Sequence, residues 1–307
     1  FFSFSLPHSR GFGLYKQPLD PLFPKSESGN VIAVRKASGE TKRRIIISGH
    51  TDSAPEWTYT YKLGSKGVLI VAGYAVAGLV YDIASTAVQL TSKNDKLKKA
   101  LAFGQLALAP GFAALYKFTN PRRHVDGASD DLSGCYIANS VMKFLSDNDV
   151  RFENTEVVAA MVGGEEAGLR GTKAFMKAHA EEFKSEKDVE TIFVAFDTIR
   201  EHEFMSIYNK DMTGVVKNDD RVAQLLQNAA KNVGYDVPIK AIELGSTDAA
   251  AASQAGIPAS AFTAMDPAPA RYYHTRLDTE DNLDPKTLEI GLKVALETVF
   301  TFDEQGI

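Results

Sequence analysis

The 307-residue sequence contains a single cysteine, Cys135, and it has no excess of positive charge. One cysteine excludes an intrachain disulfide and any metal site built from several thiolates. A formal net charge of −5 provides no positive field for nucleic acid, so no nucleic-acid partner is expected. The low cysteine content fits a reducing compartment and favours the cytoplasm, while the cell envelope stays open because many exported bacterial proteins also have few cysteines.

The sequence also lacks internal repeats and low-complexity tracts, and it is built instead from β-like runs that alternate with segments of helical period. The expected strands are 30–37, 43–49, 155–164 and 191–196, and the expected helices are 131–147, 168–184, 218–233 and 284–302. This alternation predicts one α/β domain over residues 1–307, with a mainly parallel twisted sheet and helices on both of its faces. Ligands of such sheets bind beyond the carboxyl ends of the strands.

Two short motifs with histidine or paired aspartates follow this rule. GHTDS places His50 at the end of a strand, with Asp52 two residues further on. A metal-bound imidazole needs its second nitrogen held by a carboxylate or carbonyl, which Asp52 can provide. GASDDLSG places Asp130 and Asp131 at the start of a helix, where aspartates also serve simply as N-caps. Each motif alone is therefore ambiguous.

Three further acidic or histidine motifs follow later strands or precede a helix. GGEEAGLRGT puts Glu165 and Glu166 between an apolar strand and a glycine-rich turn, where carboxylates are costly to bury without a cation. FVAFDTI ends an apolar run with Asp197, and YYHTRLDT contains His274 followed by Asp278. Taken together, the motifs supply two histidines and at least three carboxylates, a nitrogen and oxygen set that suits Zn²⁺, with Mn²⁺ and Co²⁺ as alternatives.

The ordered motif set HxD, DxxSG, EE-x-GL-x-G, strand-Asp and HTxxDT resembles metallopeptidase family twenty-eight, the di-zinc aminopeptidases and their carboxypeptidase relatives. The resemblance runs from about residue 28 to 300 outside one insertion. It implies two zinc ions and a peptide substrate hydrolysed by a metal-activated water. The implied metal ligands are His50 and Asp197 for one ion, Glu166 and His274 for the other, and Asp130 as the bridge.

The resemblance also assigns roles to residues beside the metals. Glu165 would be the general base and proton shuttle, and Asp52 would orient His50. A cis peptide bond is implied between Asp130 and Asp131.

The leading interpretation is an aminopeptidase acting on short peptides, and several alternatives stay open. Some family members place a tyrosine at the position matching Leu244, so oxyanion assistance would have to come from elsewhere, such as Tyr272 or Tyr273. Arg271 leaves a carboxypeptidase open, because a substrate carboxylate needs a cation. A dipeptidase or a one-zinc glutaminyl cyclase could share the scaffold, and a non-catalytic binding module is the alternative outside enzymes.

Residues 56–123 interrupt the α/β pattern with two apolar stretches, 67–90 and 100–118, joined by the charged TSKNDKLKK. A membrane hairpin is one interpretation of this pattern. Asp82 and Pro110 argue against it, because charge at membrane depth is costly and proline disturbs a helix. We therefore expect a helical hairpin beside the active-site mouth that does not enter a membrane, with an apolar face covered by the core or by a second subunit in a homodimer.

Overall fold

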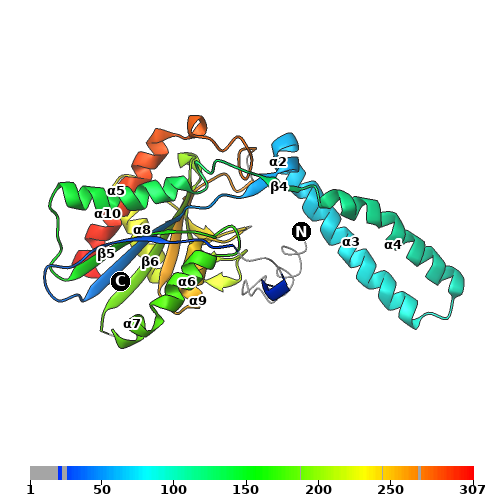
Figure 1. The fold of residues 1–307 in the computed structure, drawn as a ribbon, viewed down its shortest axis with the longest axis horizontal. Coiled ribbons are helices and arrows are strands. Elements are labelled where there is room, and N and C mark those ends of the chain that lie inside the picture. The colour runs from blue at the N-terminus through cyan, green and yellow to red at the C-terminus, as the bar shows by residue number, and fades with distance from the viewer. Residues whose placement is uncertain (1–19, 23–25, 187, 244, 269–270) are drawn as a thin grey trace. The chain divides into compact units, whose positions relative to one another are not determined.

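The computed structural model describes residues 20–22, 26–186, 188–243, 245–268 and 271–307. Within these residues the chain forms two compact units (Figure 1). The smaller unit comprises residues 55–125 and 268–277, and the larger unit comprises the remaining described residues. Each unit is described separately.

The larger unit is organised around an eight-stranded sheet. The strand order is β1-β5-β2-β6-β10-β7-β8, and β9 also pairs with β7. The strands are β1 (Val31–Arg35), β2 (Arg43–His50), β5 (Thr155–Val162), β6 (Glu190–Ile199), β7 (Met205–Asp211), β8 (Val216–Lys217), β9 (Ile239–Ala241) and β10 (Ala259–Ala264). The four central strands β5, β2, β6 and β10 are parallel, whereas β1, β7 and β8 join by antiparallel pairs. The expected mainly parallel sheet is therefore confirmed.

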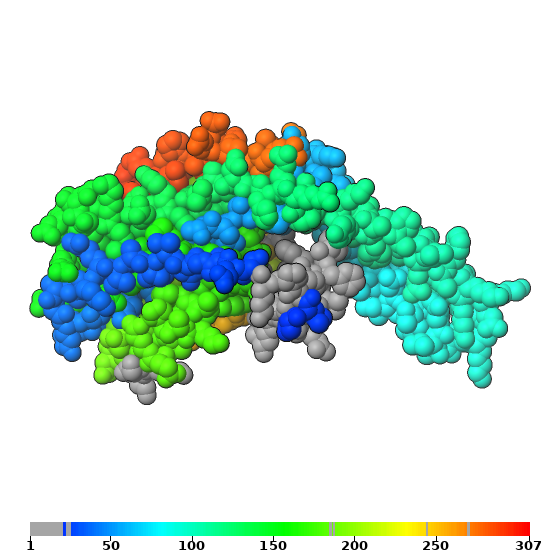
Figure 2. All heavy atoms as spheres, in the orientation of Figure 1, coloured from blue at the N-terminus to red at the C-terminus, as the bar shows by residue number. Residues whose placement is uncertain are grey.

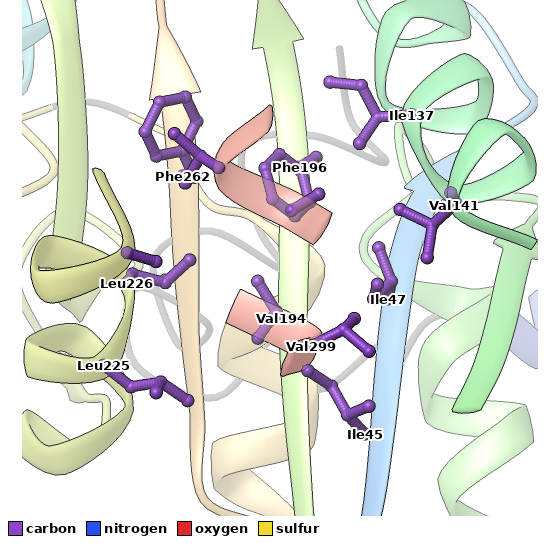
Figure 3. Close-up of a cluster of buried hydrophobic side chains, with 14 of the residues drawn as sticks. Ile45, Ile47, Ile137, Val141, Val194, Phe196, Leu225, Leu226, Phe262 and Val299 are labelled. Carbon is purple, nitrogen blue, oxygen red and sulfur yellow. The ribbon is translucent and has the colours of Figure 1, made fainter. Parts of the chain in front are cut away.

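Helices cover both faces of this sheet, as the sequence predicts (Figure 1). They are α5 (Leu132–Asp147), α8 (Asp220–Asn232) and α10 (Pro285–Gln305) on one face, and α6 (Arg170–Ala178), α7 (Ala180–Ser185) and α9 (Asp248–Gln254) on the other. Short 3-10 helices lie at Asp20–Leu22, His202–Phe204 and Glu280–Asn282. Successive residues of β2 serve opposite faces, because strand side chains alternate. Ile45 and Ile47 pack with α5 residues such as Ile137 (Figure 3), while Ile46 packs on the opposite face.

The helix expected over 168–184 is present as two separate helices, α6 and α7. Strands β7, β8, β9 and β10 are not among the strands expected from the sequence. Every residue of β10 (ASAFTA) is buried, so the strand does not show the alternation of buried apolar and exposed polar residues. Such a strand lacks the period that makes a half-buried strand recognisable.

The smaller unit contains the predicted helical hairpin. Strands β3 (Pro55–Trp57) and β4 (Thr119–His124) pair antiparallel, and between them the chain forms α2 (Thr58–Leu63), α3 (Ser65–Thr91) and α4 (Asp95–Leu115). The Asn94 side chain caps α4 by accepting hydrogen bonds from the next turn, and α4 continues through Pro110. Segment 271–277 joins this unit through Arg276, whose guanidinium contacts both carboxylate oxygens of the buried Glu56 at 2.5 and 2.8 Å.

The apolar face of the hairpin is not covered by the other described residues of the smaller unit, and its expected cover by the core or by a second subunit stays a prediction. Only 17% of the most apolar eighteen-residue window of α3 is buried. Leu69, Val76 and Ile83 are 60–70% exposed. Both helices carry apolar side chains outside the contact between α3 and α4. The periodicity of the sequence does not specify what packs against these side chains.

Candidate metal centre

Three neighbouring parallel strands of the larger unit bring the candidate ligands to one edge of the sheet. Strand β2 lies between β5 and β6. His50 is the last residue of β2 and pairs with Val162, the last residue of β5. Ser48 pairs with Ala195, and His50 and Asp197 follow two residues later on their respective strands. The sequence prediction that these residues lie at carboxyl strand ends is therefore confirmed.

His50, Asp130 and Asp197 converge at this edge. Each offers one ligand atom, and the three atoms lie within 4.8 Å of one another. The Nε2 atom of His50 is 3.1 Å from Oδ1 of Asp130 and 3.9 Å from Oε2 of Glu165. His50 and Asp130 are buried, at 2% and 4% exposure. One nitrogen and several oxygen donors thus share a small buried volume.

Two motif glycines allow helix α5 to reach this site. A Cβ on Gly49 would lie 2.3 Å from the backbone nitrogen of Cys135, and a Cβ on Gly134 would lie 2.1 Å from the carbonyl oxygen of Phe196. The N-terminus of α5 therefore packs directly on the backbones of β2 and β6. These contacts give a physical reason for the glycines in GHTDS and in DDLSG.

The two adjacent aspartates have separate structural roles. The Asp131 carboxylate caps α5 by accepting from the Gly134 N–H, and it also accepts from the backbone N–H of His50 (3.0 Å) and of Thr198 (3.1 Å). It thereby ties together β2, α5 and β6. Asp130 instead points its carboxylate at His50. The peptide bond between the two aspartates is cis, as the family resemblance implies.

Asp278 fixes the backbone that carries Asp130. Its carboxylate accepts from the backbone N–H of Ser129 (2.8 Å), from the Ser129 hydroxyl and from the backbone N–H of Asp130 (3.1 Å). Asp278 is 1% exposed. In the sequence, Asp278 is marked only by its position within HTRLDT, close to His274.

Asp52 contacts both His50 and the glutamate pair. The Nδ1 atom of His50 lies 2.9 Å from the main-chain carbonyl oxygen of Asp52, and 3.7 Å from the carboxylate. Because Nδ1–H donates to that carbonyl, Nε2 is the ring nitrogen directed at Asp130. The two carboxylate oxygens of Asp52 accept from the backbone N–H of Glu165 (2.9 Å) and Glu166 (3.1 Å). Asp52 therefore orients the histidine through its backbone and the glutamate turn through its side chain.

The electrostatics of the cluster favour added positive charge. Burial raises the pKa of Asp197 to about 7, with repulsion from Asp130 as the next cause. The pKa of Glu165 is well above its ordinary value, because burial and the nearby Asp248 and Glu166 outweigh the effect of His50. The pKa of His50 is raised despite its burial, because carboxylates surround it. A bound dication would replace these protons, so the donor set fits zinc.

The remaining sequence-predicted residues belong to the smaller unit. His274 is 7% exposed, and its ring stacks on Tyr273 with centroids 3.9 Å apart. The Trp57 ring is nearly perpendicular to the His274 ring, with centroids 4.5 Å apart. Tyr272 is buried. Arg271 donates to the Tyr61 carbonyl at 2.6 Å. Leu244 lies outside the described residues.

Solved structures with the same fold are zinc exopeptidases and related enzymes. The aminopeptidase from Aneurinibacillus sp. strain AM-1 is 19% identical with a TM-score of 0.56, over 89% of this chain and 47% of that one. The zinc aminopeptidase BSAP from Bacillus subtilis is 17% identical with a TM-score of 0.57, over 89% and 49%. The glutaminyl cyclase from Bacteroides thetaiotaomicron is 14% identical with a TM-score of 0.54, over 88% and 76%. The chain spans about half the length of the first two.

The sheet, its helices and these neighbours define the α/β zinc-exopeptidase fold. The model of peptidase family M28 matches residues 111–299, more than half of the sequence. The chain therefore belongs to peptidase family M28, a family of zinc-dependent hydrolases.

Proposed function

We propose that this chain is a di-zinc aminopeptidase that removes N-terminal residues from short peptides. The observation that carries the proposal is the convergence of His50, Asp130 and Asp197 at the carboxyl edge of the sheet, with Glu165 beside them. His50 and Asp197 would hold one ion, and Asp130 would bridge to the second. The assignment of Glu166 and His274 to the second ion rests on the family motifs.

When bound, the zinc pair lowers the pKa of a water and polarises the substrate carbonyl. Glu165, which is not a proposed metal ligand, then acts as the general base: it accepts the proton of the attacking water and delivers it to the leaving amine. Its buried position and its raised pKa suit an acid–base group that must hold a proton between these two steps. Asp52 fixes the backbone of Glu165 and so limits the positions that the carboxylate can take.

The charge of the site supports a free amino terminus as the recognised group. Eight carboxylates of the larger unit interact electrostatically or by hydrogen bonds around His50, and a zinc pair would contribute four positive charges. The eight carboxylates are those of Asp52, Asp130, Asp131, Glu165, Glu166, Asp197, Asp248 and Asp278. The remaining negative charge attracts an α-ammonium group and repels an α-carboxylate. This balance favours an aminopeptidase over a carboxypeptidase.

A glutaminyl cyclase is the second candidate, because one such enzyme shares the fold. It would act on N-terminal glutamine without releasing a residue. A peptide panel separates the candidates: zinc-loaded protein is incubated with free, N-acetylated and C-amidated forms of one short peptide, and with a glutamine-initiated peptide.

Loss of the first residue from the free and C-amidated forms, with the N-acetylated form intact, is the result expected of an aminopeptidase. Cleavage only of peptides with a free carboxylate would show a carboxypeptidase. Ring closure of the glutamine peptide without hydrolysis would show a cyclase. The Glu165→Gln variant is the matched control for contaminating peptidases, because it retains the proposed metal ligands.

A further inference from the structure

The exterior of the α3–α4 hairpin is apolar around a wide arc. In α3 the buried positions Val71, Gly78 and Ser85 recur every seven residues, which marks the strip that faces α4. At 100° per residue, Leu69, Val76 and Ile83 fall on the side of α3 that faces away from this strip. Figure 2 shows the side chains of both helices, in cyan and turquoise, at the molecular surface. A helix that is apolar on nearly all sides is typical of a buried or a membrane-spanning element.

Several polar side chains of the hairpin form hydrogen bonds from one helix to the other. Gln105 donates to the Thr86 hydroxyl at 3.1 Å, and its carbonyl accepts from Gln89 at 3.1 Å. The hydroxyl groups of Tyr74 and Tyr81 donate to backbone carbonyls of α4 at 2.8 and 3.3 Å. A hairpin in hydrocarbon needs its polar groups paired between the helices and its apolar groups on the surface, because lipid offers no hydrogen bonds.

Glycines allow close contact between the helices. Gly78 faces the ring of Phe112, and a Cβ there would lie 2.4 Å from the ring. Gly104 lies against the hydroxyl of Tyr81, and a Cβ there would lie 1.9 Å from the oxygen. Small residues at helix contacts are a feature of packing in membranes, where close approach provides the main attraction between helices.

The lengths and charges of the two helices fit a bilayer. Residues 67–92 lie between Lys66 and Lys93, span about 39 Å as a helix, and contain one charged residue, Asp82. Residues 100–116 contain no charged residue and span about 26 Å. A hydrocarbon core is about 30 Å thick, and helices tilt or shift to match it. Asp82 is half-buried in α3, and the hydroxyl of Ser85 donates to its backbone carbonyl.

Lysines stand at both ends of the apolar stretches. Lys93 lies in the connection between the helices, and Lys96, Lys98 and Lys99 lie at the start of α4. Lys66 and Lys117 lie at the opposite end of the hairpin. Such side chains reach the headgroup region from helix ends. A second protein copy would cover one strip of each helix, whereas lipid covers the full exposed arc. The observations therefore favour lipid over a dimer partner.

We propose that α3 and α4 cross a lipid bilayer as a helical hairpin. The lysine-rich turn at 93–99 lies at one membrane surface, and Lys66 and Lys117 lie at the other. The unit that carries His274 is thereby tethered to the membrane, and the substrate peptides are those that come within reach of that surface. The proposal stands independently of the enzymatic activity.

Flotation tests the proposal with the full chain reconstituted into vesicles of equal parts phosphatidylcholine and phosphatidylglycerol. The chain should float with the vesicles and resist alkaline carbonate extraction. The double variant Leu79→Lys and Ile83→Lys should reduce the floated fraction by more than about tenfold, because it places two charges in the hydrocarbon. Both side chains are exposed, at 58% and 63%, so circular dichroism should show an unchanged helix content.

Val215→Lys is the matched control, since Val215 is an exposed apolar residue outside the hairpin, and it should float like the unaltered chain. Spanning is tested by Asn94→Cys in a Cys135→Ala background, with a membrane-impermeant maleimide. The turn cysteine should stay protected in vesicles whose larger unit is accessible to added protease, and it should react once detergent is added.

Two results would overturn the proposal. One is a chain that stays in detergent-free solution and fails to float, with light scattering at twice the chain mass of 33.4 kDa; this would assign the apolar surface to a second copy. The other is a turn cysteine that reacts equally before and after detergent, which would show a hairpin that does not cross the bilayer.

Discussion

Glu165 and Glu166 are adjacent, and the proposed function gives them different tasks, so matched substitutions should have different effects. Glu165→Gln replaces one carboxylate oxygen by an amide and keeps the side-chain shape. The backbone N–H of residue 165 would still donate to Asp52 at 2.9 Å, so the glutamate turn should keep its position. Because Glu165 is not a proposed ligand, the zinc content of this variant should equal that of the unaltered protein.

The rate of peptide hydrolysis by Glu165→Gln should fall sharply. A positioned acid–base group contributes about 100- to 10,000-fold, which corresponds to about 3–5 kcal/mol in the activation free energy. Glu165 is only 9% exposed, so bulk water has little access to the position of the lost base. Most of the loss should therefore appear in kcat.

Glu166→Gln is the comparison variant, and it should lose zinc as well as activity. Zinc is measured by mass spectrometry after dialysis, and hydrolysis is followed with a peptide that has a free amino terminus. Zinc loss from Glu165→Gln with normal content in Glu166→Gln would exchange the two roles. Retention of more than about a tenth of the activity by Glu165→Gln would refute the general-base assignment.

Two further predictions concern stability and are read from chemical denaturation. Gly134→Ala should lower the free energy of unfolding by more than about 2 kcal/mol, because its Cβ would lie 2.1 Å from the Phe196 carbonyl oxygen. The control Gly29→Ala has open space around it and should change the free energy of unfolding by less than about 0.5 kcal/mol. Equal effects of the two substitutions would contradict the close packing at Gly134. Arg44→Met should cost about 1–3 kcal/mol, since the buried Glu156 carboxylate loses the guanidinium 2.6 Å away but keeps the Lys36 ammonium at 2.7 Å. Burial raises the pKa of Glu156, but hydrogen bonds from its cationic partners outweigh burial and lower it overall. The stabilisation by this pair should therefore be complete above the ordinary glutamate pKa and be lost as the pH falls through the lowered one, and a pH-independent difference between Arg44→Met and the unaltered chain would refute this.

The sequence predicts which residues come together at the candidate site better than it predicts the hydrogen bonds that hold them in place. Parallel strands place their carboxyl ends at one edge, so His50 and Asp197 could be brought together from strand assignment alone. The division of roles between Asp130 and Asp131 depends on the path of the chain into α5, and no spacing rule specifies it. The same holds for the contact from the Asp52 carbonyl to His50, because a main-chain contact leaves no residue signature.

The hairpin shows a second limit of sequence reasoning. The apolar stretches predict its two helices, but they do not specify what covers the apolar sides of these helices. In the structure α4 continues through Pro110, and the polar residues near Asp82 pair with one another across the two helices. Which side chains pair and which stay exposed depends on the register between α3 and α4, and the sequence does not specify this register.

The number of zinc ions bound per chain tests the central claim most directly. Metal-free protein is reloaded with zinc, dialysed and analysed by mass spectrometry, alongside His50→Ala and His274→Ala. We expect about two ions in the unaltered chain and about one in each variant, with hydrolysis of a free peptide only in the doubly loaded protein. A single ion in the unaltered chain, or an unchanged zinc content in both histidine variants, would contradict the two-metal centre.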